Sequence, residues 1–360
     1  MENSNNIQIN NSVTLNSVNK QTGGGKFNIL SPDWQSWCQK LKLSKTSIRF
    51  INFISPVLNF IFGGVACLYG KIKGNQMRRT YDYNLAVVAI AKNESEYIRE
   101  WVVFHKIIGV SIIYLYDNNS ADNMRDKISD FIESGFVVYE VIHGERRQCD
   151  AYNDALHKYG AKCKYMAFFD CDEFLMPKIK GVNITQLLDK YFKANGNIGG
   201  VGFNWCLFGS SGYIDKPDGL VSENYVWRAA DDEKTDRGSD GKRINYEKEG
   251  NDIVKSIISP RLVKYFASPH FPIYRYGYYS VNQDLIPFKG AYSNIKKFGL
   301  IRFNHYFTKS KNEWIKRRAI GKADMGSNDK RNLEGFYKND YHDIYDISML
   351  EYKDEIIKLI

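Results

Sequence analysis

Three acidic residues lie close together in the run FFDCDEF at residues 168–174. In an extended segment, side chains two positions apart point the same way, so the carboxylates of Asp170 and Asp172 should face one side. Such carboxylates repel one another unless a positive group lies between them, and Mg²⁺ or Mn²⁺ prefers oxygen ligands of this kind. We therefore expect a divalent cation here, able to bridge to a substrate diphosphate and neutralise its departing charge. The alternative is that these acids are solvated and only cap the next segment.

A regular alternation of strands and helices leads up to the acidic run. Apolar runs of strand length lie at 85–91, 111–116, 136–142 and 165–169, with helices expected from 93 to 109, near 124–134 and near 148–159. This order predicts right-handed crossovers and an α/β fold with a mainly parallel sheet flanked by helices. Ligands bind beyond the carboxyl ends of such strands, so the loops that leave them should share one cleft. These loops begin at Lys92, Asp117, His143 and Asp170.

Several common catalytic motifs are absent from the sequence. No G-x-G-x-x-G follows a predicted strand, and there is no G-x-x-x-x-G-K-[ST], H-E-x-x-H or G-x-S-x-G. If the protein binds phosphate, a metal and basic side chains must therefore supply the contacts.

Composition places the chain among globular proteins. It has 360 residues, of which 43% are hydrophobic and 25% charged, and this is enough to bury a sizeable core. The net charge of +9 indicates an anionic partner, unless lysine is simply abundant here, as in proteins of AT-rich genomes. None of the six cysteines forms a C-x-x-C pair, and the first twenty residues are polar. We therefore expect reduced thiols in a cytosolic compartment rather than a zinc site or a secreted protein.

The segment before the first strand has two distinct parts. Residues 1–45 are expected to be a low-complexity, disordered tail. Within residues 46–80, the stretch 50–70 has no charged residue and is flanked by lysines and arginines on both sides. Its length suits a helix lying in a membrane surface, a transmembrane helix, or a helix packed on the globular domain. We expect membrane association on the cytoplasmic side, either peripheral or single-pass.

A set of short motifs in a particular order resembles glycosyltransferase family 92 and related bacterial family-2-like glycosyltransferases, which have the GT-A fold. The resemblance covers about residues 84–325 and is carried by Lys92-Asn93-Glu94, Glu100-Trp101, Asp117–Ser120, Arg147-Gln148, Asp170–Phe174, Asn204-Trp205, Phe208–Gly212, Gly219–Val221 with Glu223, Lys255-Ser256, Asn304–Tyr306 and Lys309-Ser310.

The resemblance implies a GT-A-like, Rossmann-type domain with two halves. A nucleotide-sugar-binding half would span residues 81–198, and an aromatic-rich acceptor-side half 199–325, followed by a C-terminal helical tail at 326–360. The implied reaction is an inverting transfer of a sugar from a nucleoside diphosphate donor, often UDP-galactose in family 92, to a glycan or glycolipid acceptor. Mn²⁺ or Mg²⁺ would be the cofactor, a membrane surface a further partner, and nucleic acid is not expected.

Six residues are predicted to contact the donor besides Asp170. We expect Lys92 and Asn93 near the base and ribose, Asp117 on the base or ribose, and Arg147, Gln148 and Lys309 near the diphosphate or sugar. Each position also has a purely structural interpretation. Asn93 and Asp117 can serve as helix-terminal residues, and the basic side chains can be solvated charges.

His305 is predicted to be the third metal ligand, beside Asp170 and Asp172, with His270 as a weaker candidate; either could instead be a core histidine. Glu223 is our candidate for the catalytic base, followed by Asp218 and then Asp215. A charged strand edge would explain Glu223 equally.

Two aromatic residues have two possible roles, and two other functional classes are compatible with the motifs. Trp205 and Phe208 could stack on a sugar or pack in the core. A metal-dependent phosphohydrolase or nuclease could use Asp170 as nucleophile or ligand, but no second acidic pair forms an evident second metal site. A basic nucleic-acid-binding protein is the other alternative, but no RNA- or DNA-binding motif appears.

Overall fold

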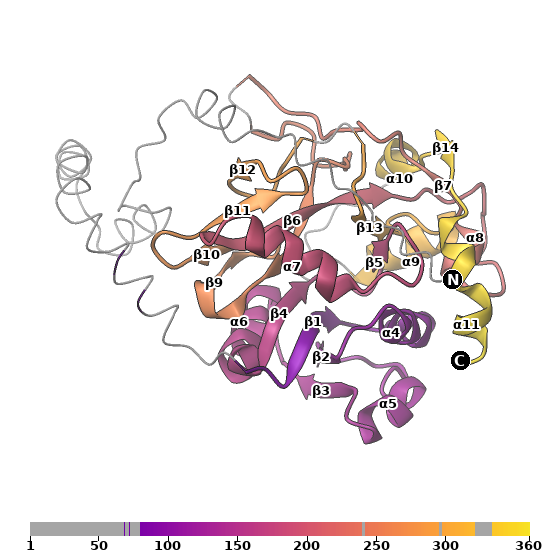
Figure 1. The fold of residues 1–360 in the computed structure, drawn as a ribbon. Coiled ribbons are helices and arrows are strands. Elements are labelled where there is room, and N and C mark those ends of the chain that lie inside the picture. The colour runs from indigo at the N-terminus through magenta and orange to yellow at the C-terminus, as the bar shows by residue number, and fades with distance from the viewer. Residues whose placement is uncertain (1–67, 69–71, 73–79, 240–241, 295–296, 321–332) are drawn as a thin grey trace, which may run out of the picture. The chain divides into compact units, whose positions relative to one another are not determined.

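The computed structural model describes residues 68, 72, 80–239, 242–294, 297–320 and 333–360 (Figure 1). The chain divides into two units, Met1–Lys73 and Gly74–Ile360, and the fold below is that of the second unit. The tail expected at 1–45 and nearly all of the segment expected at 46–80 lie outside the described residues. Within the described part, no helix combines the length and the apolar character needed to span a bilayer.

The first half of the domain is a parallel sheet, as predicted. Its strands are β1 (Tyr83–Ala91), β2 (Ile112–Asp117), β3 (Val137–Val141) and β4 (Cys163–Phe168), in the spatial order β4-β1-β2-β3. The connecting helices are α4 (Ile98–Ile107), the 3-10 helix η1 (Asp126–Ile128) with α5 (Ser129–Glu133), and α6 (Gln148–Tyr159) with the 3-10 helix η2 (Gly160–Lys162). Each predicted strand agrees with the observed one to within two residues at either end.

Both faces of this sheet are covered by helices. On β1, Leu85, Val87 and Ala89 belong to one buried cluster, which includes residues of α4 and α5. The intervening residues Ala86 and Val88 belong to a second cluster, which includes residues of α6. Successive side chains of a strand point to opposite faces, so a strand covered on both sides needs an unbroken apolar run.

The second half continues the same sheet beyond β4. Its strands β8 (Val254–Ile258), β6 (Ile198–Leu207), β11 (Tyr279–Asn282) and β12 (Pro287–Phe288) extend the order to β12-β11-β6-β8-β4-β1-β2-β3. β8 is antiparallel to both of its neighbours, β4 and β6. Off this path, β13 (Ile301–His305) pairs with β6 and with β5 (Glu173–Pro177). The fold class predicted from the sequence is therefore confirmed.

Further helices and strands flank this sheet (Figure 1). They are α7 (Ile184–Ala194), α8 (Val221–Asn224), α9 (Lys311–Ile320), the 3-10 helix η3 (Pro260–Leu262) and the paired strands β9 (Val263–Ser268) and β10 (Phe271–Tyr274). α7 packs on β6, and α9 directly follows the loop after β13.

The C-terminal segment forms part of the domain in its described portion. It contains α10 (Leu333–Asn339), β14 (Ile344–Tyr345), the 3-10 helix η4 (Ser348–Tyr352) and α11 (Lys353–Ile357). β14 pairs with β7 (Trp227–Arg228), so this segment is not purely helical. The buried Tyr352 ring packs edge-on against Phe104 of α4, and Figure 1 shows α11 in yellow beside α4.

Candidate active site

The loops after β1, β2 and β3 meet at the carboxyl edge of the sheet and are joined by asparagine side chains. The Ala121 N–H donates to Asn93 Oδ1 at 2.7 Å, which links the first two loops. Asn118 Nδ2 donates to the carbonyl oxygens of Ile142 and Gly144, both at 2.8 Å, which links the second loop to the third. Of the four loops expected to share one cleft, the first three are therefore held together at one edge of the sheet.

The predicted helix start at Asn93 is wrong. Asn93 has φ +57°, in the left-handed region that asparagine tolerates, and α4 begins only at Ile98. The side chain of Asn93 links two loops instead of capping a helix. Lys92, beside it, is exposed. Asp117 Oδ1 accepts from the Ser120 N–H at 2.8 Å and so stabilises the turn that follows β2.

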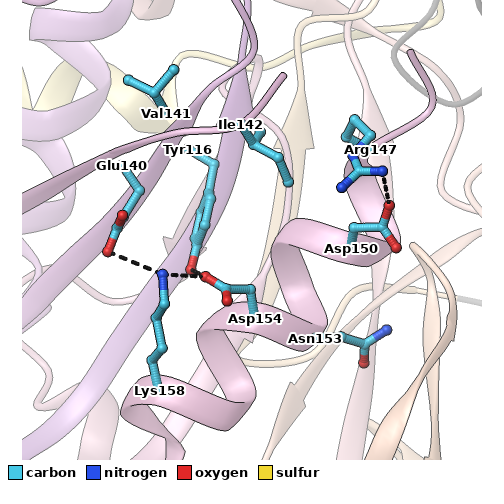
Figure 2. A pocket seen from close by; sticks show the side chains of 9 residues that line it. All are labelled: Tyr116, Glu140, Val141, Ile142, Arg147, Asp150, Asn153, Asp154 and Lys158. Atoms are coloured by element: carbon cyan, nitrogen blue, oxygen red, sulfur yellow. Dashed lines mark hydrogen bonds and ion pairs between the residues drawn. The ribbon is translucent and has the colours of Figure 1, made fainter. Parts of the chain in front are cut away.

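Arg147 and Gln148, predicted as neighbours on the donor, have different surroundings. Gln148 Nε2 donates to Asp170 Oδ1 at 2.5 Å, so Gln148 contacts the acidic run. Arg147 pairs with Asp150 at 3.0 Å and lines a cavity of about 530 Å³ between β3 and α6. Figure 2 shows this cavity, with the ion pair between Lys158 and Glu140 at its other side.

The acidic run forms a turn rather than an extended segment. β4 ends at Phe168, β5 begins at Glu173, and the Glu173 N–H donates to the Asp170 carbonyl at 3.1 Å. Asp170 and Asp172 therefore have different partners, contrary to the expectation that alternation would direct them to one side. We call residues Asp170–Glu173 the acidic turn.

Asp170 and Glu173 share one cation. Lys255 Nζ of β8 lies 2.8 Å from Asp170 Oδ2 and 3.4 Å from Glu173 Oε1. Burial raises the pKa of Glu173 well above its usual value, even though the positive charge of Lys255 opposes this shift. Both oxygens of Asp170 are occupied, one by Lys255 and the other by Gln148.

Asp172 faces β13 and α9. Its Oδ1 lies 3.5 Å from His305 Nε2, and its Oδ2 accepts from Arg317 at 2.6 Å. Burial alone would raise the pKa of Asp172, but Arg317 and His305 hold it well below its usual value. The carboxylate is therefore ionised in the folded protein.

Among the described residues, Asp172, Glu173 and His305 form a cluster that could hold a metal ion. One ligand atom from each lies within 4.8 Å of the others, and all three side chains are buried. His305 and Glu173 are opposite one another in the β13–β5 register, which explains how distant residues meet. The carboxylate oxygens of Glu173 and the Nδ1 of His305 have no hydrogen-bond partner. Oxygen donors with one imidazole suit Mn²⁺, so these residues fit the cation that the sequence implied.

The structure thus brings together two of the three predicted metal ligands, Asp172 and His305, with Glu173 in the third place. Asp170 is adjacent, but its two carboxylate oxygens accept hydrogen bonds from Lys255 and Gln148. Sequence reasoning assigned no role to Glu173, Lys255 or Arg317. For Lys255 a signal existed, since it is a single charge within the buried strand VKSII. For Arg317 there was none, because it is one of four lysines and arginines in the sequence of α9 and nothing in the pattern distinguishes it from the others.

Lys309 lies at the same edge but is not exposed. Only 2% of the residue is accessible, and its ammonium lies 3.4 Å from the centre of the Tyr97 ring and 3.9 Å from Glu94 Oε2. Burial lowers the pKa of Lys309 to about 8, although the charge of Glu94 opposes the shift. Its backbone has φ +50°, an uncommon conformation for lysine. A donor diphosphate would have to compete with Glu94 for this ammonium.

The acceptor-side candidates are not joined to the acidic turn. Glu223 lies on α8, and its Oε1 pairs with Lys353 Nζ at 2.5 Å. Asp218 and Asp215 are exposed in the preceding loop, where Asp215 accepts from Asn312 Nδ2 at 2.6 Å. Within the described part of the chain, no hydrogen bond or ion pair links these three carboxylates to Asp172.

The two aromatic candidates have core positions, and the half-buried His270 packs beside one of them. Trp205 and Phe208 are both buried; Trp205 lies 4.3 Å from the His305 ring and Phe208 4.9 Å from Tyr306, as centroid distances. His270 packs edge-on against Trp205, and burial lowers its pKa to about 3. Trp205 thus packs against His305 in the core, and its buried ring has no surface to offer a sugar.

A family comparison identifies the domain. Residues 86–319 match the model of glycosyltransferase family 92. The chain belongs to this family. The matched region contains most of β1, the acidic turn, His305 and Arg317, so it includes all three residues of the cluster. The family predicted from the sequence motifs is therefore confirmed, and membership favours a transferase over the hydrolase and nucleic-acid-binding alternatives.

Individual family-92 relatives are distant and longer. A glycosyltransferase family 92 protein of Ricinus communis is 25% identical over 155 residues, which are 42% of this chain and 28% of that protein. A galactan beta-1,4-galactosyltransferase of Arabidopsis thaliana is 30% identical over 132 residues, covering 32% of this chain and 26% of that protein. The aligned region thus makes up only about a quarter of the length of these relatives.

Solved structures offer a weaker similarity. The S. aureus TarS fragment 1-349, in complex with UDP-GlcNAc, superposes with a TM-score of 0.31 and 11% identity, covering 50% of this chain and 46% of that one. The family assignment therefore depends on the sequence match over residues 86–319.

Proposed function

We propose that this chain is a metal-dependent, inverting glycosyltransferase that moves a sugar from a UDP-linked donor to a glycan or glycolipid acceptor at a membrane surface. The observation that supports it most directly is the buried cluster of Asp172, Glu173 and His305. It lies next to Asp170, at the sheet edge where the loops after β1, β2 and β3 are joined. The galactan galactosyltransferases among the relatives favour a galactosyl donor.

Each requirement of the reaction can be assigned to particular residues. Asp172, Glu173 and His305 would hold the cation, which when bound supplies positive charge opposite the leaving diphosphate. Gln148 and Lys255 orient Asp170 beside that position. Lys309 adds a second positive charge once it exchanges Glu94 for a phosphate oxygen.

The proton of the acceptor hydroxyl needs a carboxylate on the side opposite the diphosphate. Glu223 is our candidate, with Asp218 as the second. Glu223 would have to exchange its partner Lys353 for the acceptor hydroxyl. Such an exchange is inexpensive, because an ion pair between half-exposed side chains contributes only about 0–1 kcal/mol.

Thermal denaturation with a panel of ligands tests the proposal. UDP together with Mn²⁺ should raise the melting temperature, whereas UDP with EDTA, or DNA, should not. Metal-dependent hydrolysis of individual nucleotide sugars would then identify the donor, and proton NMR of the anomeric position would give the stereochemical outcome. Stabilisation by UDP that is unchanged in EDTA would contradict the metal requirement, and a product with the donor's anomeric configuration would contradict inversion.

A further inference from the structure

Lys255 is a buried charge whose position follows from the sheet topology. β8 lies between β4 and β6, and all five of its residues are buried. Lys255 is 1% exposed and pairs with Phe203 of β6 in the register, next to the end of β4. An ammonium in such a position is costly to desolvate unless carboxylates compensate it. The carboxylates that pair with Lys255 therefore offset part of the cost of burying its charge.

The acidic turn supplies those partners. The ammonium of Lys255 lies 2.8 Å from Asp170 Oδ2 and 3.4 Å from Glu173 Oε1, and so it bridges the two ends of the turn. The Glu173 oxygens have no hydrogen-bond donor, so the charge of Lys255 is what compensates this carboxylate. A divalent cation that used Glu173 would have to share its oxygens with Lys255.

The charges around the acidic turn determine how strongly it attracts a divalent cation. Three carboxylates, those of Asp170, Asp172 and Glu173, face two permanent cations, Lys255 and Arg317. With all three carboxylates ionised, as binding of a cation requires, the net charge of these five groups is −1 instead of the −3 of the carboxylates alone. Electrostatic interactions are strong in a buried site, so each of these cations weakens the attraction for Mn²⁺.

We propose that Lys255 is a built-in counter-ion of the acidic turn: it holds Asp170 and Glu173 in place when no metal is bound, and it competes with the divalent cation for them. The donor-free protein therefore binds the cation weakly. The inference relies on the proposed function only in taking the turn as the cation site, and its test measures binding instead of transfer.

Isothermal titration of the full-length, donor-free protein with MnCl₂ provides the test. Lys255→Gln removes the charge and keeps a polar group near both carboxylates, so it should bind Mn²⁺ at least about tenfold more tightly than the wild type. Mn²⁺ should also raise its melting temperature by more than it does for the wild type. Lys255→Arg, which keeps the charge, should retain weak binding. The matched control is Lys162→Gln, at an exposed position, which should change nothing.

A residue that merely supported the fold would give the opposite result, because its loss would weaken metal binding. Equal or weaker Mn²⁺ affinity in folded Lys255→Gln would therefore overturn the inference. If no variant and no wild-type protein binds Mn²⁺, the proposed metal dependence itself fails. Should Lys255→Gln not fold, Lys255→Gln with Asp170→Asn is compared with Asp170→Asn alone. The double variant leaves Glu173 without its counter-ion and should bind Mn²⁺ more tightly.

Discussion

At the scale of single residues, the charge state of Asp172 depends on partners from two different elements. His305 comes from β13 and Arg317 from α9, and both keep the carboxylate ionised despite its burial. An ionised, buried carboxylate next to an imidazole without a partner on Nδ1 is an arrangement that a cation would complete.

We predict that Asp172→Ala abolishes both transfer and the Mn²⁺-dependent binding of UDP. The substitution removes a ligand and leaves Arg317 without its carboxylate. A nucleotide titration with and without Mn²⁺ measures the loss, and circular dichroism checks that the fold persists. Asp189→Ala, at a salt bridge on α7, is a suitable control. A purified Asp172→Ala protein with wild-type activity would refute the assignment.

Glu223→Gln should lower kcat by roughly 10²–10⁴-fold while donor affinity barely changes, because it removes a proton acceptor and keeps the shape. Lys353→Met removes the partner of Glu223 without touching the carboxylate and should preserve activity. If donor binding collapses while the rate per bound donor does not, Glu223 is a donor contact. If neither quantity changes, the base is Asp218 or Asp215.

His105 makes folding stability depend on pH. Its ring is fully buried; Nδ1–H donates to the Trp101 carbonyl at 2.7 Å, and Nε2 accepts from the Leu175 N–H at 3.1 Å. Both nitrogens of the neutral ring are thus hydrogen-bonded. Burial lowers the pKa of His105 to about 3. Because this lies below the unfolded-state pKa of about 6.5, the contribution is complete above pH 6.5 and is lost as the pH falls.

We expect the wild type to lose about 2 kcal/mol of unfolding free energy from this group between pH 7.5 and 5.0. His105→Gln keeps an acceptor for Leu175 and has no ionisable group. The stability difference between the two proteins, measured by urea denaturation, should therefore shrink by that amount over the same interval. A difference that is independent of pH would show that His105 does not titrate in this way. The other histidines, including His270 and the buried His305, are present in both proteins, so their contributions cancel.

At the scale of elements, α8 is held by a residue from another helix. Glu100 of α4 accepts from the backbone N–H groups of Val221 and Ser222 at 2.7 and 3.0 Å, and from Ser222 Oγ at 2.6 Å. A four-residue helix has little stability of its own, so this buried carboxylate determines where α8, and with it Glu223, lies.

Glu100→Gln should destabilise the domain by roughly 1–3 kcal/mol, since its amide group would face an N–H donor that has lost its acceptor. Urea denaturation measures the cost. If Glu223 is the base, kcat should fall as well, while the Mn²⁺ affinity of the acidic turn should not, because Glu100 makes its hydrogen bonds to α8. Wild-type stability in Glu100→Gln would show that water or a rearranged loop replaces these hydrogen bonds.

At the scale of the whole molecule, the described part of the second unit has a buried core that extends from β1 to α11. Its core includes residues from Leu85 to Ile356. The C-terminal segment is tied in by Asp346, which pairs with Arg228 and Arg302 at 2.7 and 2.8 Å. Opposing charges hold the pKa of Asp346 well below its usual value in spite of its burial. Because of this network, removal of the C-terminal segment should destabilise the domain.

We predict that deleting residues 1–80 yields a folded, soluble protein, and that the full-length chain partitions to membranes through residues 46–80. The reason is the charge-free stretch at 50–70 with basic flanks. Flotation of both proteins with vesicles containing anionic lipid measures the difference. A full-length protein that stays in the soluble fraction without detergent would contradict the prediction.

The sequence by itself determined the first four strands, the helix at 148–159 and the position of the acidic run. A strand buried on both faces must be a continuous apolar run, and such runs are visible without any partner. The family could also be inferred, because short motifs in a fixed order survive even where overall identity is low. These features depend on residues that are close together in the chain.

Only the tertiary structure decided which charges meet. Lys255 is 85 residues from Asp170, and Arg317 is 145 residues from Asp172. The Lys255 contact forms because β8 lies antiparallel between β4 and β6. The Arg317 contact forms because β13 pairs with β5, and α9 follows β13 in the chain. Strand order is set by how the whole core packs, and no local pattern encodes it. For the same reason, the turn that separates Asp170 from Asp172 could not be distinguished from an extended segment until β5 had a partner.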